Sequence, residues 1–193
     1  MDTYSNRVLN VVSPFSEDTV ARLKAGDQLS ISGVLYAARD AAHKRLVEAL
    51  AHPDKSGLPF DIKGQTIYYV GPTPAKPGEV IGSAGPTTSS RMDPYTPKLL
   101  EAGLRATVGK GGRSPAVREA LVRHKAIYLA TLAGAGALLS RRIRKAELVA
   151  YGELGPEAIL RLEVEDFPAI VINDIYGADW FQIAKAQYAR PVG

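Results

Sequence analysis

The spacing between hydrophobic residues changes several times along the chain, from the alternation of a strand to the wider spacing of a helix. Residues 28–36 alternate apolar with small or polar side chains, as a strand with one buried face does. Directly afterwards, residues 38–50 place Ala42, Leu46 and Ala49 at helical spacing. A strand followed at once by an amphipathic helix is typical of α/β proteins.

The same patterns predict further elements along the rest of the chain. Ser16 is an N-cap candidate, and Ser114 before Pro115 is another, because Pro favours the first helical position. Apolar and β-branched runs predict strands at residues 7–12, 28–36, 66–70, 80–83, 104–108, 126–131, 146–151, 160–164 and 169–173. Helical spacing and capping residues predict helices at 16–24, 38–50, 97–102, 114–124, 135–142 and 179–188. Strands that alternate with short helices predict an α/β fold with a mixed, largely parallel sheet.

Length and composition favour one compact domain over residues 1–193. The chain has 193 residues, of which 46% are hydrophobic, enough for one well-buried core. The 18 Gly and 13 Pro are spread between apolar runs, so they are interpreted as turn residues.

The charge of the chain is mild. It has 24 basic and 20 acidic residues, a net charge of +4, and only the run at 141–145 concentrates positive charge. We interpret that run as a solvated face, and we expect no nucleic-acid partner. The first nine residues are polar, and no stretch approaches the roughly 18 apolar residues of a membrane span. We therefore expect a cytoplasmic protein without a membrane partner.

The chain lacks the usual ligands of a metal centre. It contains no cysteine, and its three histidines, His43, His52 and His124, show no ligand spacing. We therefore predict no metal ligand in this chain, so any metal chemistry requires ligands from another chain.

Two strand-to-helix turns carry candidate anion-binding residues. Such turns expose backbone N–H groups at the carboxyl ends of strands, where α/β proteins bind ligands. In the first, at 37–40, Arg39 either binds a carboxylate or pairs with Asp40 or a nearby helix. The second, at 85–93, collects hydroxyl groups and Arg91, an arrangement suited to a carboxylate or phosphate, although helix capping explains one or two of the hydroxyls.

Two glycine-rich turns are less specific. Residues 108–115 place Lys110 among glycines before a helix, either as a charge for a ligand or as a plain turn. This segment lacks the spacing of a Walker P-loop. Residues 133–139 begin like a dinucleotide-binding motif but have Leu139 in place of its last glycine, so we interpret them as close helix packing. The residues alone thus predict an anion site and no reaction.

Several ordered motifs resemble one known family. Gly-Pro-Thr-Pro-Ala-Lys-Pro-Gly at 71–78, Gly-Ser-Ala-Gly-Pro-Thr-Thr-Ser-Ser-Arg-Met-Asp at 82–93 and Gly-Lys-Gly-Gly-Arg-Ser at 109–114 are similar to the C-terminal part of class I fumarases and to the β subunit of tartrate dehydratases. Ala-Arg-Asp-Ala-Ala-His-Lys-Arg at 38–45 and Glu-Val-Glu-Asp-Phe-Pro-Ala at 163–169 resemble the same family.

The resemblance implies a swivelling β/β/α domain and a hydro-lyase reaction. It implies the reversible hydration of fumarate to malate, with L-tartrate dehydration or a non-catalytic anion-binding or assembly module as alternatives. In such a family a [4Fe-4S] cluster with one open iron acts as a Lewis acid. The cluster is implied to be held by a separate α subunit, in an α2β2 hetero-oligomer.

The resemblance also assigns roles to four residues. Proton transfer falls on Thr87, the first threonine of Gly-Pro-Thr-Thr, and substrate binding falls on Arg39, Arg91 and Lys110. A threonine hydroxyl is a poor base unless its alkoxide is stabilised, and neighbouring cations are physically suited to that task. The same cations suit a carboxylate on which negative charge builds up.

Overall fold

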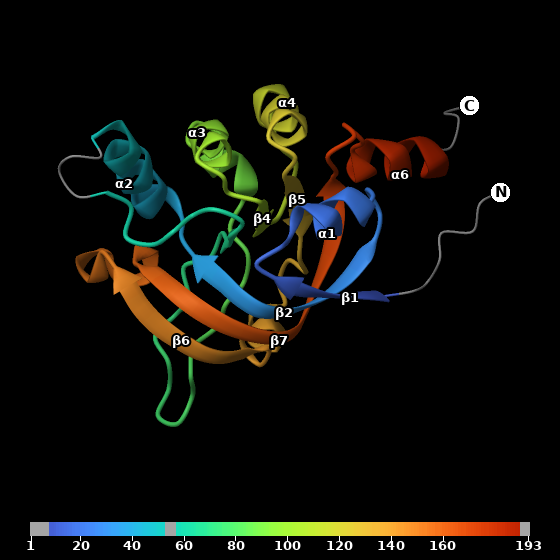
Figure 1. Ribbon diagram of the computed structural model, residues 1–193. Coiled ribbons are helices and arrows are strands. Elements are labelled where there is room, and N and C mark those ends of the chain that lie inside the picture. Colours follow the sequence, from blue (N-terminus) through green and yellow to red (C-terminus); the bar gives the residue numbers. More distant parts are fainter. Residues whose placement is uncertain (1–7, 53–56, 190–193) are drawn as a thin grey trace.

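In the computed structural model, which describes residues 8–52 and 57–189, five strands close into a barrel (Figure 1). The ring consists of β2 (Gln28–Ala37), β3 (Thr66–Tyr68), β4 (Ala106–Gly109), β5 (Ile127–Ala130) and β7 (Ile159–Asn173). The first four are parallel neighbours, and β7 closes the ring by pairing antiparallel with both β5 and β2. Two strands lie outside the ring: β1 (Val8–Ser13) pairs parallel with β2, and β6 (Ile143–Ala150) pairs antiparallel with β7.

The expected swivelling β/β/α domain with a largely parallel sheet is therefore wrong. Its two C-terminal strands, predicted at 160–164 and 169–173, are one strand of 15 residues. Asp166 adopts a left-handed φ of 51° in the middle of it, and the register with β2 shifts between Ile31 and Gly33. An irregularity of this kind bends a strand, so that one half of β7 pairs with β6 and the other half with β5, while β2 runs along its opposite edge.

The strand predicted at 80–83 is also absent. These residues belong to the loop that joins β3 to η1 (Ser89–Met92), and the loop extends beyond the barrel on the side away from the longer helices (Figure 1). Gly82 packs closely against Thr73 and Pro74 in the loop. Ile81 and the nearby Ala84 are buried in the same apolar cluster as Tyr68 and Phe167, although their segment does not join the sheet.

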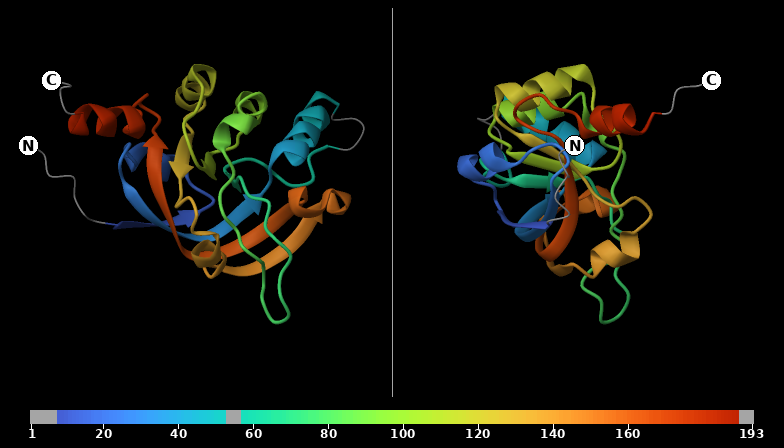
Figure 2. Two further views of the ribbon diagram at one scale, coloured as in Figure 1. Left: turned by 180° about the vertical axis from the view of Figure 1, so that it is seen from behind. Right: turned by 90° about the vertical axis from the view of Figure 1, so that its right-hand side faces the viewer.

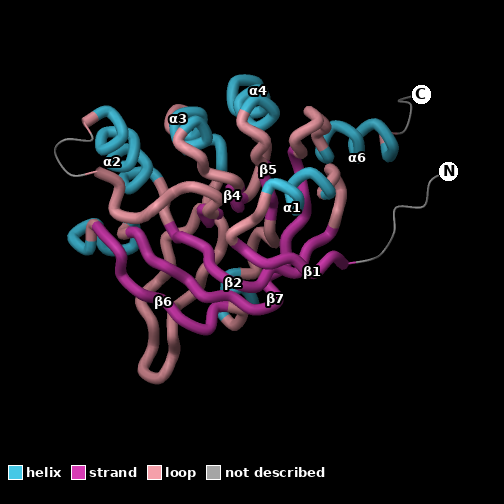
Figure 3. The backbone as a smooth tube through the Cα atoms, viewed as in Figure 1, coloured by secondary structure: helices cyan, strands magenta, loops and turns pink. Residues whose placement is uncertain are grey.

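The longer helices lie along one side of the barrel (Figures 2 and 3). The helices are α1 (Glu17–Arg22), α2 (Asp40–Ala51), α3 (Thr96–Glu101), α4 (Pro115–Arg123), α5 (Gly136–Ser140) and α6 (Trp180–Tyr188), and a second 3-10 segment is η2 (Gly152–Glu157). Both predicted N-caps are confirmed, because the side chain of Ser16 accepts from Thr19 N and that of Ser114 from Val117 N. Because α2, α3 and α4 follow β2, the β3–η1 region and β4 directly, they begin at one edge of the barrel.

Strand alternation divides the buried apolar residues into two layers. Tyr68 points into the barrel, where it meets Phe167 with ring centroids 5.2 Å apart, and the next residue, Tyr69, belongs to the layer beneath the helices. That second layer also contains Leu46 of α2 and Leu121 of α4. The helix layer therefore packs on the outer face of the barrel strands.

No helix in residues 8–52 or 57–189 is long and apolar enough to cross a membrane. The basic run at 141–145 forms a solvated face as predicted, with only Ile143 buried. Three of its cations pair with exposed carboxylates, Arg142 with Asp166, Arg144 with Glu165 and Lys145 with Glu147.

Candidate functional site

Residues from three predicted turns meet at the edge where β2, β3 and β4 end. The backbone N–H of Thr87 donates to Tyr69 O at 2.7 Å, and that of Ser89 donates to Lys110 O at 2.9 Å. Thr88 forms an isolated parallel bridge with Lys110. The hydroxyl-rich loop is thus inserted between the ends of β3 and β4 and lies beside Lys110.

Close approach of this loop to β4 depends on Gly109. A Cβ at this position would overlap the Ser89 hydroxyl and lie 2.9 Å from the Tyr69 ring. Ser89 is fully buried, and its hydroxyl lies 2.9 Å from the Tyr128 hydroxyl, which donates to Gly111 O at 2.6 Å. The glycine-rich turn is therefore part of the site's framework.

The hydroxyls of the loop are not explained by helix capping. Thr88 is the N-cap of η1 but makes no side-chain cap hydrogen bond. Within the described residues, the Thr87 hydroxyl and the Lys110 ammonium group have no hydrogen-bond or ion-pair partner, and both residues are half-buried. A proton-bearing group and a cation are thus available to a ligand at this edge.

Two arginines meet at a single carboxylate beside the loop. Arg91 Nε donates to Asp40 Oδ1 at 2.8 Å, and Arg39 Nε donates to Asp40 Oδ2 at 3.3 Å. Burial alone would raise the pKa of Asp40, but its backbone hydrogen bond and the charge of Arg91 outweigh burial and lower it. Asp40 is therefore ionised at neutral pH, and the predicted pairing of Arg39 with Asp40 is present.

A second carboxylate supports Arg39 and the start of α2. Glu157 Oε1 lies 3.3 Å from Arg39 NH2, and its Oε2 accepts the Ala41 N–H at 2.8 Å. Because Arg39, the N-cap of α2, makes no side-chain cap hydrogen bond, Glu157 satisfies a free N–H of the first turn instead. No local sequence pattern indicates this contact, since η2 lies far along the chain from Arg39.

Beneath these exposed groups lies a buried polar cluster centred on Arg113. Its Nε donates to Asp93 Oδ1 at 2.8 Å, its NH2 to Thr96 Oγ1 at 2.7 Å and its NH1 to the Tyr69 hydroxyl at 3.1 Å. Burial opposes the charge, but Tyr69 and Asp93 outweigh burial and raise the pKa of Arg113. Arg113 belongs to the Gly-Lys-Gly-Gly-Arg-Ser motif, but it was not among the predicted site residues. The motif was the sequence signal that could have identified it.

His43 is the other buried titratable group near the site. Its Nδ1 lies 3.0 Å from Arg39 O, and its Nε2 is buried without a partner among the described residues. Burial lowers the pKa of His43 to about 4, so the ring is neutral at pH 7. A neutral ring that donates from Nδ1 holds the backbone of Arg39 at the start of α2.

The remaining glycine-rich turn is packed, as predicted. A Cβ on Gly136 would lie 3.0 Å from Gly85 N, and Ala84 N donates to Gly136 O at 3.1 Å. The turn therefore packs directly against the loop that carries Thr87 and supports it.

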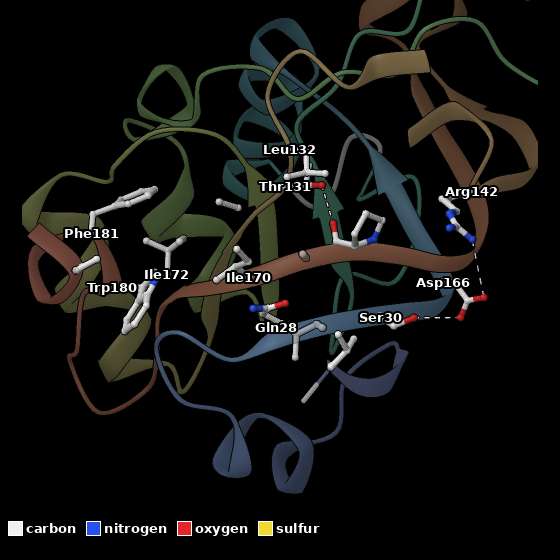
Figure 4. Close-up of a pocket in the computed structure, with 16 residues that line it drawn as sticks. Gln28, Ser30, Thr131, Leu132, Arg142, Asp166, Ile170, Ile172, Trp180 and Phe181 are labelled. Atoms are coloured by element: carbon white, nitrogen blue, oxygen red, sulfur yellow. Dashed lines mark hydrogen bonds and ion pairs between the residues drawn. The ribbon is translucent and has the colours of Figure 1, made fainter. Parts of the chain in front are cut away.

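A mainly apolar groove lies elsewhere on the molecule, between α6 and the strands β2, β5 and β7 (Figure 4). Its volume is about 660 Å³, and Trp180 and Phe181 line one end of it. At the other end, Asp166 accepts from the Ser30 hydroxyl at 3.0 Å and lies 4.0 Å from Arg142. The one cation that lines the groove among the described residues already faces a carboxylate, and the rest of the lining is mainly apolar. The edge that carries Arg39, Arg91 and Lys110 also offers the ammonium group of Lys110, which is unpaired in the described part of the chain, so this edge suits a small anion better.

Comparisons with known proteins show the family of this chain. Residues 2–184 match the family described as Fumarase C-terminus. The chain belongs to this family. The resemblance identified from the motifs is therefore confirmed.

Two kinds of relative match this chain. The chain is 40% identical over 173 residues to a protein named fumarate hydratase class I, aerobic, from Salmonella typhimurium, and 38% identical over 176 residues to a putative fumarate hydratase class I from Geobacillus stearothermophilus. The matches cover 88% and 89% of this chain but only 30% and 33% of those relatives. The chain is also 33% identical over 185 residues to the L(+)-tartrate dehydratase subunit beta of Escherichia coli, a match that covers 93% of this chain and 90% of that subunit. The chain thus spans about a third of the fumarate hydratases and nearly the whole of a separate β subunit.

Proposed function

We propose that this chain acts as the β subunit of a hydro-lyase that hydrates fumarate reversibly to malate. The observation that carries the proposal is the meeting of Thr87, Arg91 and Lys110 at one edge of the barrel, together with the match to a β subunit of similar length. Arg39 joins them through Asp40.

The proposed chemistry of these residues follows from their groups. Hydration of fumarate adds a proton to one carbon of its double bond and a hydroxyl group to the other, and the reverse reaction removes both as water. Thr87 is proposed to transfer this proton, since its hydroxyl is not bonded within the described residues. Lys110, Arg91 and Arg39 are proposed to bind the substrate carboxylates and to stabilise the negative charge that develops as the proton leaves.

The proposal places an iron-sulfur cluster on a partner and not on this chain. The 193 residues include no cysteine, and the described residues contain no group of three His, Asp or Glu side chains that could hold a metal ion. This donor set does not fit a [4Fe-4S] cluster, which needs thiolate ligands. An α subunit that supplies those ligands, in an α2β2 assembly in the cytoplasm, completes the proposal.

Two alternatives use the same edge. L-tartrate dehydration is favoured by the β subunit of similar length among the relatives. Fumarate and tartrate differ by hydroxyl groups, so substrate profiling of the complex with both compounds separates these reactions. A non-catalytic anion-binding or assembly module is the other alternative, and it predicts binding of dicarboxylates without turnover.

The test is co-expression with an α subunit that supplies the cluster ligands, followed by anaerobic reconstitution of the cluster. In that complex, Thr87→Ala is expected to lower kcat by about 100-fold or more, as loss of a proton-transfer group does. Thr87→Ser keeps the hydroxyl and should restore part of the rate, and Thr88→Ala, which removes the neighbouring hydroxyl, should be far milder. Near-wild-type turnover of Thr87→Ala would remove Thr87 from the reaction. Absence of turnover on both dicarboxylates with an intact cluster would refute the hydro-lyase proposal itself.

A further inference from the structure

Asp40 contacts both arginines of the site, one with each carboxylate oxygen. Oδ1 accepts from Arg91 Nε at 2.8 Å, and Oδ2 accepts from Arg39 Nε at 3.3 Å. The arginines come from different elements, Arg39 from the end of β2 and Arg91 from η1. The position of one guanidinium relative to the other is therefore set through this carboxylate.

The two guanidinium groups are held to different extents. Arg39 is fixed on three sides, because Nε meets Asp40, NH2 meets Glu157 at 3.3 Å, and NH1 lies over Gly71, where a Cβ would come within 2.6 Å of it. Arg91 is held only at Nε, and its side chain is 50% exposed. Its two terminal nitrogens have no partner among the described residues. They form the fork that a carboxylate binds with two parallel hydrogen bonds.

We propose that Asp40 is a positioning residue that holds Arg91 at Nε, aligned with Arg39, so that the free fork of Arg91 meets a dicarboxylate in one orientation. The inference rests on the proposed function for the identity of the ligand, but the contacts of Asp40 stand without it.

The charges of the cluster distinguish this positioning role from a second role, in which Asp40 would only neutralise the positive charge of the arginines. Arg39, Arg91, Asp40 and Glu157 together carry no net charge, so loss of the Asp40 charge makes the cluster positive by one unit. If Asp40 only reduced the positive charge of the site, its removal would strengthen binding of a dianion. If Asp40 aligns the arginines, its removal weakens binding, because an amide replaces one of the two oxygens with an NH2 group, which cannot accept from the second Nε–H.

The experiment compares Asp40→Asn with wild type in the reconstituted complex of both subunits. We expect KM for fumarate, or for L-tartrate if that is the substrate, to rise about tenfold, the loss of one charge-assisted hydrogen bond, with a smaller change in kcat. Asp40→Glu, which keeps both acceptors, should recover part of the affinity. Asp166→Asn is the matched control, because Asp166 is also a carboxylate facing an arginine but lines the apolar groove, and its φ of 51° suits asparagine. An unchanged or lower KM for Asp40→Asn would overturn the positioning role.

A second measurement separates this inference from the proposed function. The Nε–H NMR signals of Arg39 and Arg91 in the full chain should both shift in Asp40→Asn and remain in place in Asp166→Asn. Unchanged signals in Asp40→Asn would overturn the inference even in an active enzyme. If the wild-type complex neither hydrates fumarate nor dehydrates L-tartrate, the proposed function fails, and the Nε–H signals still decide whether Asp40 aligns the arginines.

Discussion

The guanidinium group of Arg113 is completely buried against the carboxylate of Asp93, with Nε 2.8 Å from Oδ1. The other oxygen of Asp93 accepts the Ser114 N–H at 2.7 Å. This ion pair therefore ties the segment before α3 to the start of α4. Both segments border the loops that carry Arg91 and Lys110, so the buried pair forms the floor of the candidate site.

Arg113→Met is predicted to destabilise the fold strongly. The substitution keeps most of the apolar stem but leaves the Asp93 carboxylate, whose side chain is 13% exposed, without its cation. Removal of one partner from a buried ion pair costs about 3 kcal/mol or more in the free energy of unfolding. Urea denaturation followed by circular dichroism measures this change through the midpoint.

Arg144→Met is the matched control. It removes the arginine of the Arg144–Glu165 pair, whose side chains are 55% and 58% exposed, so the free energy of unfolding should change by less than about 1 kcal/mol. Equal effects of the two substitutions would contradict the assignment of Arg113 as a structural centre.

Gly109→Ala is predicted to displace the Thr87 loop. The added methyl group would overlap the Ser89 hydroxyl and the Tyr69 ring, both of them buried, so the cost is about 1–3 kcal/mol in the free energy of unfolding. Gly112→Ala, three residues later, adds its methyl group to open space at a backbone conformation that alanine adopts, and should be within about 0.5 kcal/mol of wild type. Thermal unfolding of the two variants side by side tests the close approach, which a similar midpoint for both would disprove.

The candidate site residues were predictable because their signals are local. Arg39 and Lys110 each follow a strand and precede a helix, and Thr87 and Arg91 lie in a hydroxyl-rich turn. Parallel strands bring such turns to one edge, whether or not the sheet closes. The meeting of these residues thus survived the wrong fold prediction, although their roles stay predictions.

The barrel was not predictable by the same means. Closure depends on β7 pairing with β2 and β5, contacts between segments more than 30 residues apart that no local pattern records. The sequence around Asp166 and Pro168 looks like a break between two strands, since both residue types are rare in strands. The structure accommodates them within one bent strand.

The support of the site was missed for a related reason. Arg113 stands in a glycine-rich turn, where an arginine is usually solvated, and it is buried only because Tyr69, Tyr128 and Asp93 arrive from other elements. Glu157 reaches Arg39 from η2 in the same way. Contacts of this kind follow from the closed barrel and the helix layer on it.

His43 gives a prediction for the pH dependence of stability. Burial lowers its pKa from 6.5 to about 4 in the folded chain, so the unfolded chain takes up the proton first as the pH falls. The free energy of unfolding should therefore decrease between pH 6.5 and about 4 and then level off for this group, with a total of about 3 kcal/mol at most. Urea titrations at a series of pH values measure it.

Two histidine variants separate the contribution of His43 to the pH dependence of stability from the contributions of the carboxylates. His43→Gln should lose this slope, whereas His52→Gln, at an exposed position, should keep it. An identical pH profile for wild type and His43→Gln would show that His43 is not the buried neutral group described above.

Arg91→Lys tests whether the fork of Arg91, and not only its charge, binds the substrate. Lysine keeps the positive charge, but it is a point charge that lacks both the Nε–H bonded to Asp40 and the planar pair of terminal nitrogens. In the reconstituted complex we expect KM for the dicarboxylate to rise about tenfold or more, from the loss of a bidentate charge-assisted pair. Arg142→Lys, in the exposed pair with Asp166, is the control and should leave KM unchanged. If both variants bind the dicarboxylate as wild type does, a positive charge at position 91 is enough for binding, and the planar geometry of the Arg91 guanidinium group does not select the ligand. If only Arg91→Lys binds more weakly, the selection depends on the free fork that the Asp40 contact leaves at the surface.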